Sequence, residues 1–459
     1  MNRRGALPRW CALALAVACT GAWAQAAAPA APAATVTLSE LYRQARPIEA
    51  RLKVAESTFR SNAEQLPQAQ AQLRPQVQLS AGRFKNSLDS TVPGLLGPVD
   101  TRDNYISRSD TLQLRQPLYR PQQWAAVKSA EHIVGAAQAQ RDQEYGNFAT
   151  RVATAYFDAV LSTGQVQYTR ELVEQLRLQL TAAQRLFAAG QGIRTDVDEV
   201  QAQLDSALAD QIEAGQYQAF SAQQLAVLLG GRPAGVPALK LETLDSLLAG
   251  ADLDVGAWQE RARARSSELR QLREQLAASR EDLRRAESGH KPTLDLIAQR
   301  SRTQNDNVTR LRSAFDNTSL GVQLNFPIYS GGLVNSQVRQ ALSDVEKNEF
   351  ALDAGLVDLD SRVRKEHRSV VEGIARLRAL QQAVASARTA QLSAERSFQA
   401  GVRTRVDIAR AIQRVAQQQR DALQSACSTL LARLRLELLT SGSEDDAAAA
   451  VDWIDRALR

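Results

Sequence analysis

Two groups of charged residues in this chain share the spacing F-x-A-G-x-x-x-R-x-D-[VI], and they are the first candidates for chemistry. The first group contains Phe187, Gly190, Arg194 and Asp196, and the second contains Phe398, Gly401, Arg405 and Asp407, 211 residues later. Each glycine supplies the conformational freedom that a helix-ending turn needs. An aspartate in the first turn of the next helix interacts favourably with the positive end of the helix dipole. The spacing therefore predicts two equivalent helical hairpins with charged turns.

Residues that could support catalysis are sparse. His132, His290 and His367 are the only histidines, and none lies at metal-ligand spacing with Cys, Asp or Glu partners. The chain also lacks a G-x-S-x-G nucleophile elbow and a phosphate-binding loop. We therefore expect no enzymatic activity, no cofactor and no metal site.

The N-terminus resembles an export signal peptide. Two arginines precede an apolar run over residues 11–20, and Ala22-Trp23-Ala24 offers a cleavage site. A second interpretation, in which Cys19 is lipid-modified, stays open, although the usual leucine three residues earlier is missing. Removal of the signal peptide leaves Cys427 as the single cysteine. It cannot form an internal disulfide, and we expect it to be a small core residue among leucines.

Two further echoes indicate a tandem duplication of the whole chain. Residues 113–119 (QLRQPLY) reappear as residues 323–329 (QLNFPIY), 210 positions later, and residues 75–79 (PQVQL) reappear as residues 292–296 (PTLDL), 217 positions later. The predicted organisation is a signal peptide over 1–24, a disordered Ala/Pro leader over 25–36, a first repeat over 37–230, a linker over 231–254, a second repeat over 255–441 and a C-terminal tail over 442–459.

Each repeat is expected to contain one long helix and one return helix. Two stretches of roughly 65 residues, after Pro121 and after Leu333, contain no proline and predict helices about 100 Å long. Apolar residues recur along them at coiled-coil spacing, and the tip turns are expected over 188–195 and 399–404. Gln391 interrupts the second seam, so the second hairpin should pack less firmly. No segment after the signal peptide approaches the about 18 apolar residues of a membrane-spanning helix.

Four strand candidates lie before the long helices. Each alternates apolar with polar residues, and the clearest does so through Leu320, Val322 and Leu324. Such alternation over about 9–11 residues is typical of strands that have lipid on one face and water on the other. The candidates cover about 76–86, 109–119, 293–303 and 317–329.

The number of strands in one chain determines how many copies are needed. Four strands cannot close a barrel, and an unpaired edge is not tolerated in hydrocarbon. Several copies must therefore pool their strands. Two copies would give eight strands with an interior filled by side chains, whereas three copies would give twelve strands and an aqueous lumen. Three duplicated chains would also place six equivalent repeats in a ring. The predicted fold is mainly α, with a membrane β-barrel shared by three copies.

From about Leu38 to Leu439 the chain resembles the TolC family of outer-membrane export channels. The resemblance rests on residues 289–296 (GHKPTLDL) at the third strand, residues 327–338 (PIYSGGLVNSQV) after the fourth, and residues 153–157 (ATAYF) on the first long helix. It implies a homotrimer with a 12-stranded barrel in outer-membrane lipid, continuous with a long α-helical coiled-coil barrel in the periplasm.

The resemblance also implies roles for tip residues. Asp407 matches an aspartate that narrows the family's periplasmic aperture, and Arg410 replaces a second aspartate and can pair with Asp407 along the helix. Arg403 and Asp196 match an arginine and an aspartate whose link ties the closed state, and Phe398 matches an aromatic residue beside it. Simple capping of a helix stays an alternative for both aspartates. Adaptor docking is expected at Gly190, Arg194, Gly401 and Arg405.

The expected function is a passive exit duct that works with a periplasmic adaptor and an inner-membrane pump, either ABC-type or proton-driven. The net charge of +6, from 56 basic and 50 acidic residues, is too mild and too mixed for nucleic-acid binding. Type I protein secretion and multidrug efflux both stay open, and the weak lipidation signal favours secretion. A soluble periplasmic coiled-coil scaffold would explain the helices and leave the strands without a purpose.

Overall fold

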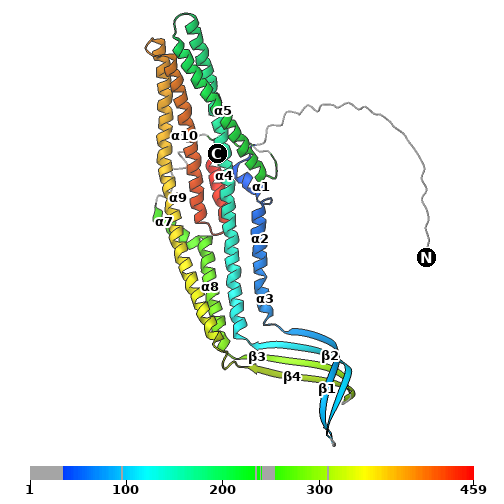
Figure 1. The fold of residues 1–459 in the computed structure, drawn as a ribbon. Helices are drawn as coiled ribbons and strands as arrows, with labels where there is room; N and C mark the ends of the chain where they lie inside the picture. Colours follow the sequence, from blue (N-terminus) through cyan, green and yellow to red (C-terminus); the bar gives the residue numbers. More distant parts are fainter. Residues whose placement is uncertain are drawn as a thin grey trace, which may run out of the picture. The chain divides into compact units, whose positions relative to one another are not determined.

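The computed structural model describes residues 35–94, 97–232, 235–237, 239, 254–307 and 310–458. The predicted signal peptide, nearly all of the leader and most of the 231–254 linker lie outside these residues, and so does Cys19. Within the described residues the protein is mainly helical, with one four-stranded sheet (Figure 1).

The same order of elements occurs in both repeats. The first repeat contains α1 (Leu38–Ala45), α2 (Ala50–Ala63), α3 (Gln65–Ala71), β1 (Gln76–Gly94), β2 (Gly97–Tyr119), α4 (Pro121–Ala188) and α5 (Arg194–Leu228). The second contains α7 (Val255–Arg265), α8 (Ser267–Glu287), a 3₁₀ turn η2 (Ser288–His290), β3 (Thr293–Asn307), β4 (Arg310–Asn325), α9 (Leu333–Gln399) and α10 (Arg405–Leu439). One more helix, α11 (Glu444–Leu458), follows.

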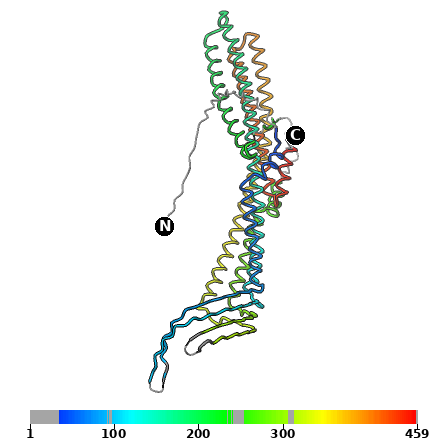
Figure 2. The backbone as a smooth tube through the Cα atoms, turned by 90° about the vertical axis from the view of Figure 1, so that its right-hand side faces the viewer, coloured from blue at the N-terminus to red at the C-terminus, as the bar shows by residue number. Residues whose placement is uncertain are grey.

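The long helices are as extended as the sequence predicts. α4 has 68 residues and α9 has 67, and Pro121 occupies the first turn of α4, where its missing N–H costs nothing. Near the sheet, α4 contacts α2 and α8, and α8 also contacts α9. Towards the turns, α4 packs on α5 and α9 packs on α10, and α10 also contacts α4. Both turns lie at the end of the long helices remote from the sheet (Figures 1 and 2).

The sheet has the order β1-β2-β3-β4, and every neighbouring pair is antiparallel. On one face the register aligns glutamines across three strands, Gln78 with Gln113 and Gln113 with Gln299. On the other face Leu114 aligns with Ala298, which aligns with Leu320. On this apolar face Leu79, Leu112 and Leu320 are exposed in a single chain, as expected for strands that face lipid.

The strands differ from the predicted spans at their ends. β1 and β2 stay paired up to Gly94 and Gly97, far beyond residues 86 and 109, because polar side chains pair across the ladder. Thr91 Oγ1 donates to Asp100 Oδ1 at 2.6 Å, for example. One face is polar here, and the other mixes Leu88 and Val99 with Ser90, Thr101 and Asp103, so the alternation is too weak to mark the strand. β4 ends at Asn325, short of residue 329, because Pro327 has no N–H for the ladder.

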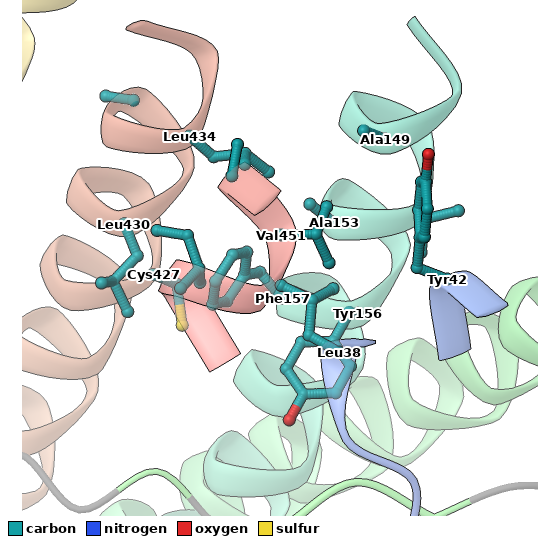
Figure 3. Packing of buried hydrophobic residues seen from close by; sticks show 14 of the residues in the cluster. Leu38, Tyr42, Ala149, Ala153, Tyr156, Phe157, Cys427, Leu430, Leu434 and Val451 are labelled. Atoms are coloured by element: carbon teal, nitrogen blue, oxygen red, sulfur yellow. The ribbon is translucent and has the colours of Figure 1, made fainter. Parts of the chain in front are cut away.

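The largest apolar core lies where α1, α4, α10 and α11 meet (Figure 3). Phe148 and Leu38 are fully buried there. Cys427 is buried beside Leu430, which confirms that it is a core residue, and burial raises the pKa of its thiol to about 12.

The C-terminal tail is a helix that the sequence pattern did not predict. Asp455 of α11 accepts hydrogen bonds from the backbone N–H of Leu38 at 3.0 Å and from Ser39 Oγ at 2.9 Å, so α11 satisfies the N-terminus of α1. The Arg433 guanidinium of α10 lies 4.8 Å from the ring of Trp258 and 5.1 Å from the ring of Trp453. These contacts join α11 to α1 and, through Arg433, α10 to α7 and α11. Among the described residues, no helix combines the length and apolar character needed to cross a membrane.

A charged cluster joins the sheet to α4. Asp295 on β3 is only 4% exposed and accepts hydrogen bonds from Arg115 Nε on β2 and from Arg120 Nε just before α4, both at 2.9 Å. Two arginines on one buried carboxylate fix the direction in which the chain leaves the sheet.

Replacement of this carboxylate should be costly. A hydrogen bond to a charged group typically contributes about 1.5–3 kcal/mol, and Asp295→Ala removes such bonds from Arg120, which is mostly buried, and from Arg115, which is partly exposed. We therefore expect Asp295→Ala to lower the unfolding temperature in detergent clearly. Asp316→Ala is the matched control, since Asp316 pairs with Arg300 in an exposed position, where a single ion pair contributes little to stability. Equal effects of the two substitutions would contradict the role given to Asp295.

Candidate functional site

The two hairpin turns have the same backbone structure. Gly190 and Gly401 adopt left-handed φ angles of 71° and 74°. The Gly190 N–H donates to the carbonyl of Phe187 at 3.0 Å, and the Gln191 N–H donates to the carbonyl of Leu186 at 3.0 Å. Gly401 and Val402 repeat both bonds at 2.9 Å. This is the Schellman arrangement, which requires a residue that tolerates positive φ.

The return helices begin differently. At the start of α10 the Thr404 hydroxyl accepts from the Asp407 N–H at 3.3 Å, and Asp407 Oδ2 accepts from the Thr404 N–H at 3.0 Å, forming a capping box. The pKa of the Asp407 carboxyl is lowered mainly by the bond from the Thr404 N–H, with smaller contributions from the Thr404 hydroxyl, Arg403 and Arg410. At the start of α5 no side chain caps the helix, and the Asp196 N–H donates to the Ile193 carbonyl at 3.3 Å. Asp407 therefore caps its helix, and its role in an aperture stays a prediction.

Arg405 is fixed between two elements. Its guanidinium lies 4.1 Å from the centre of the Phe398 ring, and its Nη1 donates to Gln179 Oε1 on α4 at 3.1 Å. Burial lowers the pKa of the Arg405 guanidinium. Arg405 thus holds the end of α9 and the start of α10 against the first hairpin.

Arg410 pairs with a different residue from the one expected. The expected partner was Asp407 on the same helix, but Arg410 forms a salt bridge with Glu199 of α5, because the capping box already engages Asp407. Both side chains are largely exposed. The pair joins the return helices of the two repeats.

Arg403 and Asp196 are not brought together within one chain. Arg403 is exposed, and in the part of the chain that the structure describes no ion pair joins these two residues. Arg194, the counterpart of Arg405, faces Asp198 of its own helix at 3.7 Å. At the turns themselves the side chains of Ile193 and Val402 are 60% and 78% exposed. The tips therefore present apolar side chains and arginines to the solvent.

Three residues of this site were missed by sequence reasoning: Thr404, Gln179 and Glu199. The T-x-x-D spacing of Thr404 and Asp407 was a visible capping signal. Glu199 lies at the position that the duplication makes equivalent to Arg410, 211 residues earlier, so the repeat itself marked it. Nothing in the sequence marks Gln179.

The arrangement can couple two helical hairpins through charge. Across the described ranges, no three His, Cys, Asp or Glu side chains gather into a possible metal site. His132 Nδ1 lies 2.8 Å from Glu274 Oε2, and His290 Nε2 lies 3.1 Å from Asn335 Oδ1, both far along the chain from the tips.

Comparison with known proteins gives one consistent result. The family described as outer membrane efflux protein matches residues 41–231 and 258–442. These two ranges cover most of the chain and coincide closely with the two repeats.

Individual relatives and solved structures agree with this match. The alkaline protease secretion protein AprF of Pseudomonas aeruginosa is 29% identical over 356 residues, covering 75% of this chain and 71% of AprF. The proteases secretion protein PrtF of Dickeya chrysanthemi is 27% identical over 417 residues, covering 89% of both chains. The outer-membrane channel OprN shares the fold with a TM-score of 0.75 at 18% identity, over 89% of this chain and 90% of OprN. VceC of Vibrio cholerae does so with a TM-score of 0.71 at 19% identity, over 88% and 96%.

The turn geometry predicts the effect of removing a glycine. An alanine at position 401 would be forced into the left-handed region, which costs about 1–2 kcal/mol. Gly401→Ala should therefore speed hydrogen exchange of the backbone amides around residues 397–406 by about 5–30-fold. Gly215→Ala is the matched control, because Gly215 lies inside α5 with open space around it, and alanine favours a helix by about 1 kcal/mol. If Gly401→Ala left the hydrogen-exchange rates of the amides in this turn unchanged, the result would contradict this account.

Proposed function

Because the chain belongs to the outer membrane efflux protein family, we propose that three copies form the outer-membrane exit duct of a type I protein secretion system. The chain is an outer-membrane export channel with a long periplasmic helical part. The finer elements of the proposal are the number of copies, the gate, the partners and the cargo.

The unpaired strands support an assembly of several copies. β1 and β4 are both edges in a single chain, and hydrocarbon does not tolerate unpaired backbone groups. Pairing β4 of one copy with β1 of the next removes every edge when the ring closes. Three copies give twelve strands, enough for a water-filled lumen.

The wall of the helical part is suited to passive conduction. A polar groove is lined by residues of α2, α4, α8 and α9, which are neighbours in that order, and we propose that these helices form an arc with the groove on its concave side. Six glutamines contribute uncharged amides to its lining (Gln122, Gln140, Gln271, Gln275, Gln337 and Gln340), and its charged residues are balanced, with Asp282 and Asp344 against Arg285 and Lys347. Closure of the arcs into a ring would turn this side towards the lumen. Amides hydrate a passing chain without trapping either charge.

The gate of the duct would be held by charges at the tips. Glu199 and Arg410 are equivalent positions in the two repeats, so in a ring of three copies glutamates and arginines alternate around one level. Each Arg410 would then have a Glu199 on either side. Arg403 and Asp196 are candidates for a second link, between neighbouring copies, and Asp407 lines the aperture beside them with Phe398 behind.

The proposed partners are a periplasmic adaptor that binds the tips and an inner-membrane pump that supplies energy. The exposed apolar residues Ile193 and Val402, with Gly190, Arg194, Gly401 and Arg405, form the proposed docking surface for a periplasmic adaptor. The chain has no phosphate-binding loop, so an inner-membrane pump would supply the energy. We also propose that the chain has no catalytic activity of its own.

The cargo proposal rests on the relatives. Two of them, AprF and PrtF, are named as protease secretion proteins, and PrtF matches along nearly the whole chain. This favours protein cargo. The family description, which names efflux, supports small-molecule export as the second candidate.

The gate can be tested by its conductance. Arg410→Gln breaks the link between the return helices, and we expect a higher single-channel conductance in planar bilayers, because the tips then relax outwards. Combining Arg410→Glu with Glu199→Arg keeps the charges alternating and should restore the wild-type value. Arg194→Gln is the control, because Arg194 pairs within its own helix and should leave conductance unchanged. Wild-type conductance of Arg410→Gln would count against the gate.

The cargo can be tested in a strain that lacks the gene. We expect one or a few proteins to disappear from the culture supernatant, with unchanged sensitivity to dyes, detergents and antibiotics. Intact secretion with raised drug sensitivity would contradict the secretion role and favour efflux. Loss of both functions would indicate a duct shared by several pumps.

A further inference from the structure

We infer that Lys53 of one copy forms an ion pair with Asp353 of the neighbouring copy, at the interface that closes the ring. The inference rests on the proposed assembly and adds the residues by which one copy recognises the next. The basis is a contact between the two repeats of one chain. Because the chain is duplicated, an equivalent contact is required between neighbouring chains.

The contact inside the chain lies between the two repeats. Asp142 on α4 is buried and accepts hydrogen bonds from Arg141, at 3.0 Å, and from Arg270 of α8. Because α8 belongs to the second repeat and α4 to the first, this cluster is part of the first-to-second repeat interface. A ring needs an equivalent interface from the second repeat of one copy to the first repeat of the next.

The register of the two repeats identifies the equivalent residues. On the long helices a shift of 211 superposes buried positions, as in Phe148 with Leu359, Val152 with Val363 and Ala183 with Ala394. On the preceding helices a shift of 217 does the same, as in Leu41 with Trp258, Ala45 with Ala262 and Leu52 with Leu269. The side-chain helix caps Thr37 and Asp254 also obey the shift of 217.

These shifts convert the observed pair into the inferred one. Asp142 becomes Asp353 on α9, and Arg270 becomes Lys53 on α2, so both signs of charge are kept. Lys53 and Asp353 are exposed in the single chain, and within the described residues neither has an ion-pair partner. Lys53 on α2 and Asp353 on α9 thus carry opposite charges on two different sides of one chain. A contact between identical copies requires such a complementary pair.

A second contact, nearer the tips, points to the same interface. Leu423 of α10, 2% exposed, packs against Gly164 of α4, where an added Cβ would clash with its side chain. The equivalent residues are Ile212 of α5, which is 65% exposed, and Ala375 of α9, which is also exposed. Ile212 would be buried by the α9 of a neighbouring copy, against a small residue as in the template. Phe220 and Val227 continue this exposed face, whereas their counterparts Leu431 and Leu438 pack on the core.

The two kinds of interface differ in strength. Arg141, which adds a second cation to Asp142, corresponds to the apolar Leu352, so Asp353 has one cation where Asp142 has two. The interface between copies is thus the less firmly tied one. A ring of three copies would alternate three firm and three weaker interfaces.

Cross-linking between copies tests the pair directly. Lys53→Cys combined with Asp353→Cys, treated with a short bis-maleimide in outer-membrane vesicles, should give dimers and trimers on a denaturing gel. Lys53→Cys combined with Asp344→Cys is the matched control, because Asp344 lies on the same helix about 13 Å away and should remain monomeric. The natural Cys427 is buried and adds little background.

Charge exchange gives a second readout. Lys53→Asp alone should weaken the detergent-resistant oligomer, and addition of Asp353→Lys should restore it. If an amine-reactive cross-linker joins three copies while the variant carrying both Lys53→Cys and Asp353→Cys stays monomeric with the bis-maleimide, the inferred pair is wrong and the proposed duct stands. If the amine-reactive reagent also gives only monomers, the assembly and the pair both fail.

Discussion

The unpaired edges of the sheet are the constraint on which the rest of the structure depends. β1 and β4 each leave a row of backbone N–H and C=O groups without partners in one chain. Hydrocarbon cannot satisfy these groups, so copies must add strands until the sheet closes. Closure turns the polar face with Gln78, Gln113 and Gln299 inwards and the leucine face towards lipid. The long helices continue that ring away from the membrane.

Buried carboxylates join the sheet to the long helix α4 and join the helices to one another. Among the described residues, none of them lies at the tips. Asp295 joins the sheet to α4, Asp142 joins α4 to α8, and Asp455 joins α1 to α11. Each is buried, so losing a partner would leave an uncompensated charge. The link at the tips, between Arg410 and Glu199, is exposed and therefore worth little by itself. In the duct that we propose, this difference would make the part near the sheet firm and the tips easier to open.

Most of the fold could be predicted, because it rests on periodicity. Alternation located the membrane part of the strands, and Gly190 and Gly401 located the turns. The outer half of the β1–β2 hairpin escaped prediction because its few apolar residues, such as Leu88 and Val99, give only a weak alternation. α11 was missed although Ala447, Ala450, Val451 and Ile454 form a buried stripe at helical spacing, because small alanines make up half of that stripe. At the site, the Thr404–Asp407 cap was readable from spacing. The partner of Arg410 was not, because it lies on another helix, and whether Arg403 meets Asp196 depends on a neighbouring copy.

The number of copies in the membrane is the most direct test of this account. Native mass spectrometry of the protein extracted from outer membranes in mild detergent would count them without assuming any function. We predict three copies, which supply twelve strands and six equivalent repeats. A dimer would supply eight strands, and side chains would fill the interior of that barrel. A monomer would leave both edges of the sheet unpaired. Either result would contradict an aqueous duct built from this chain.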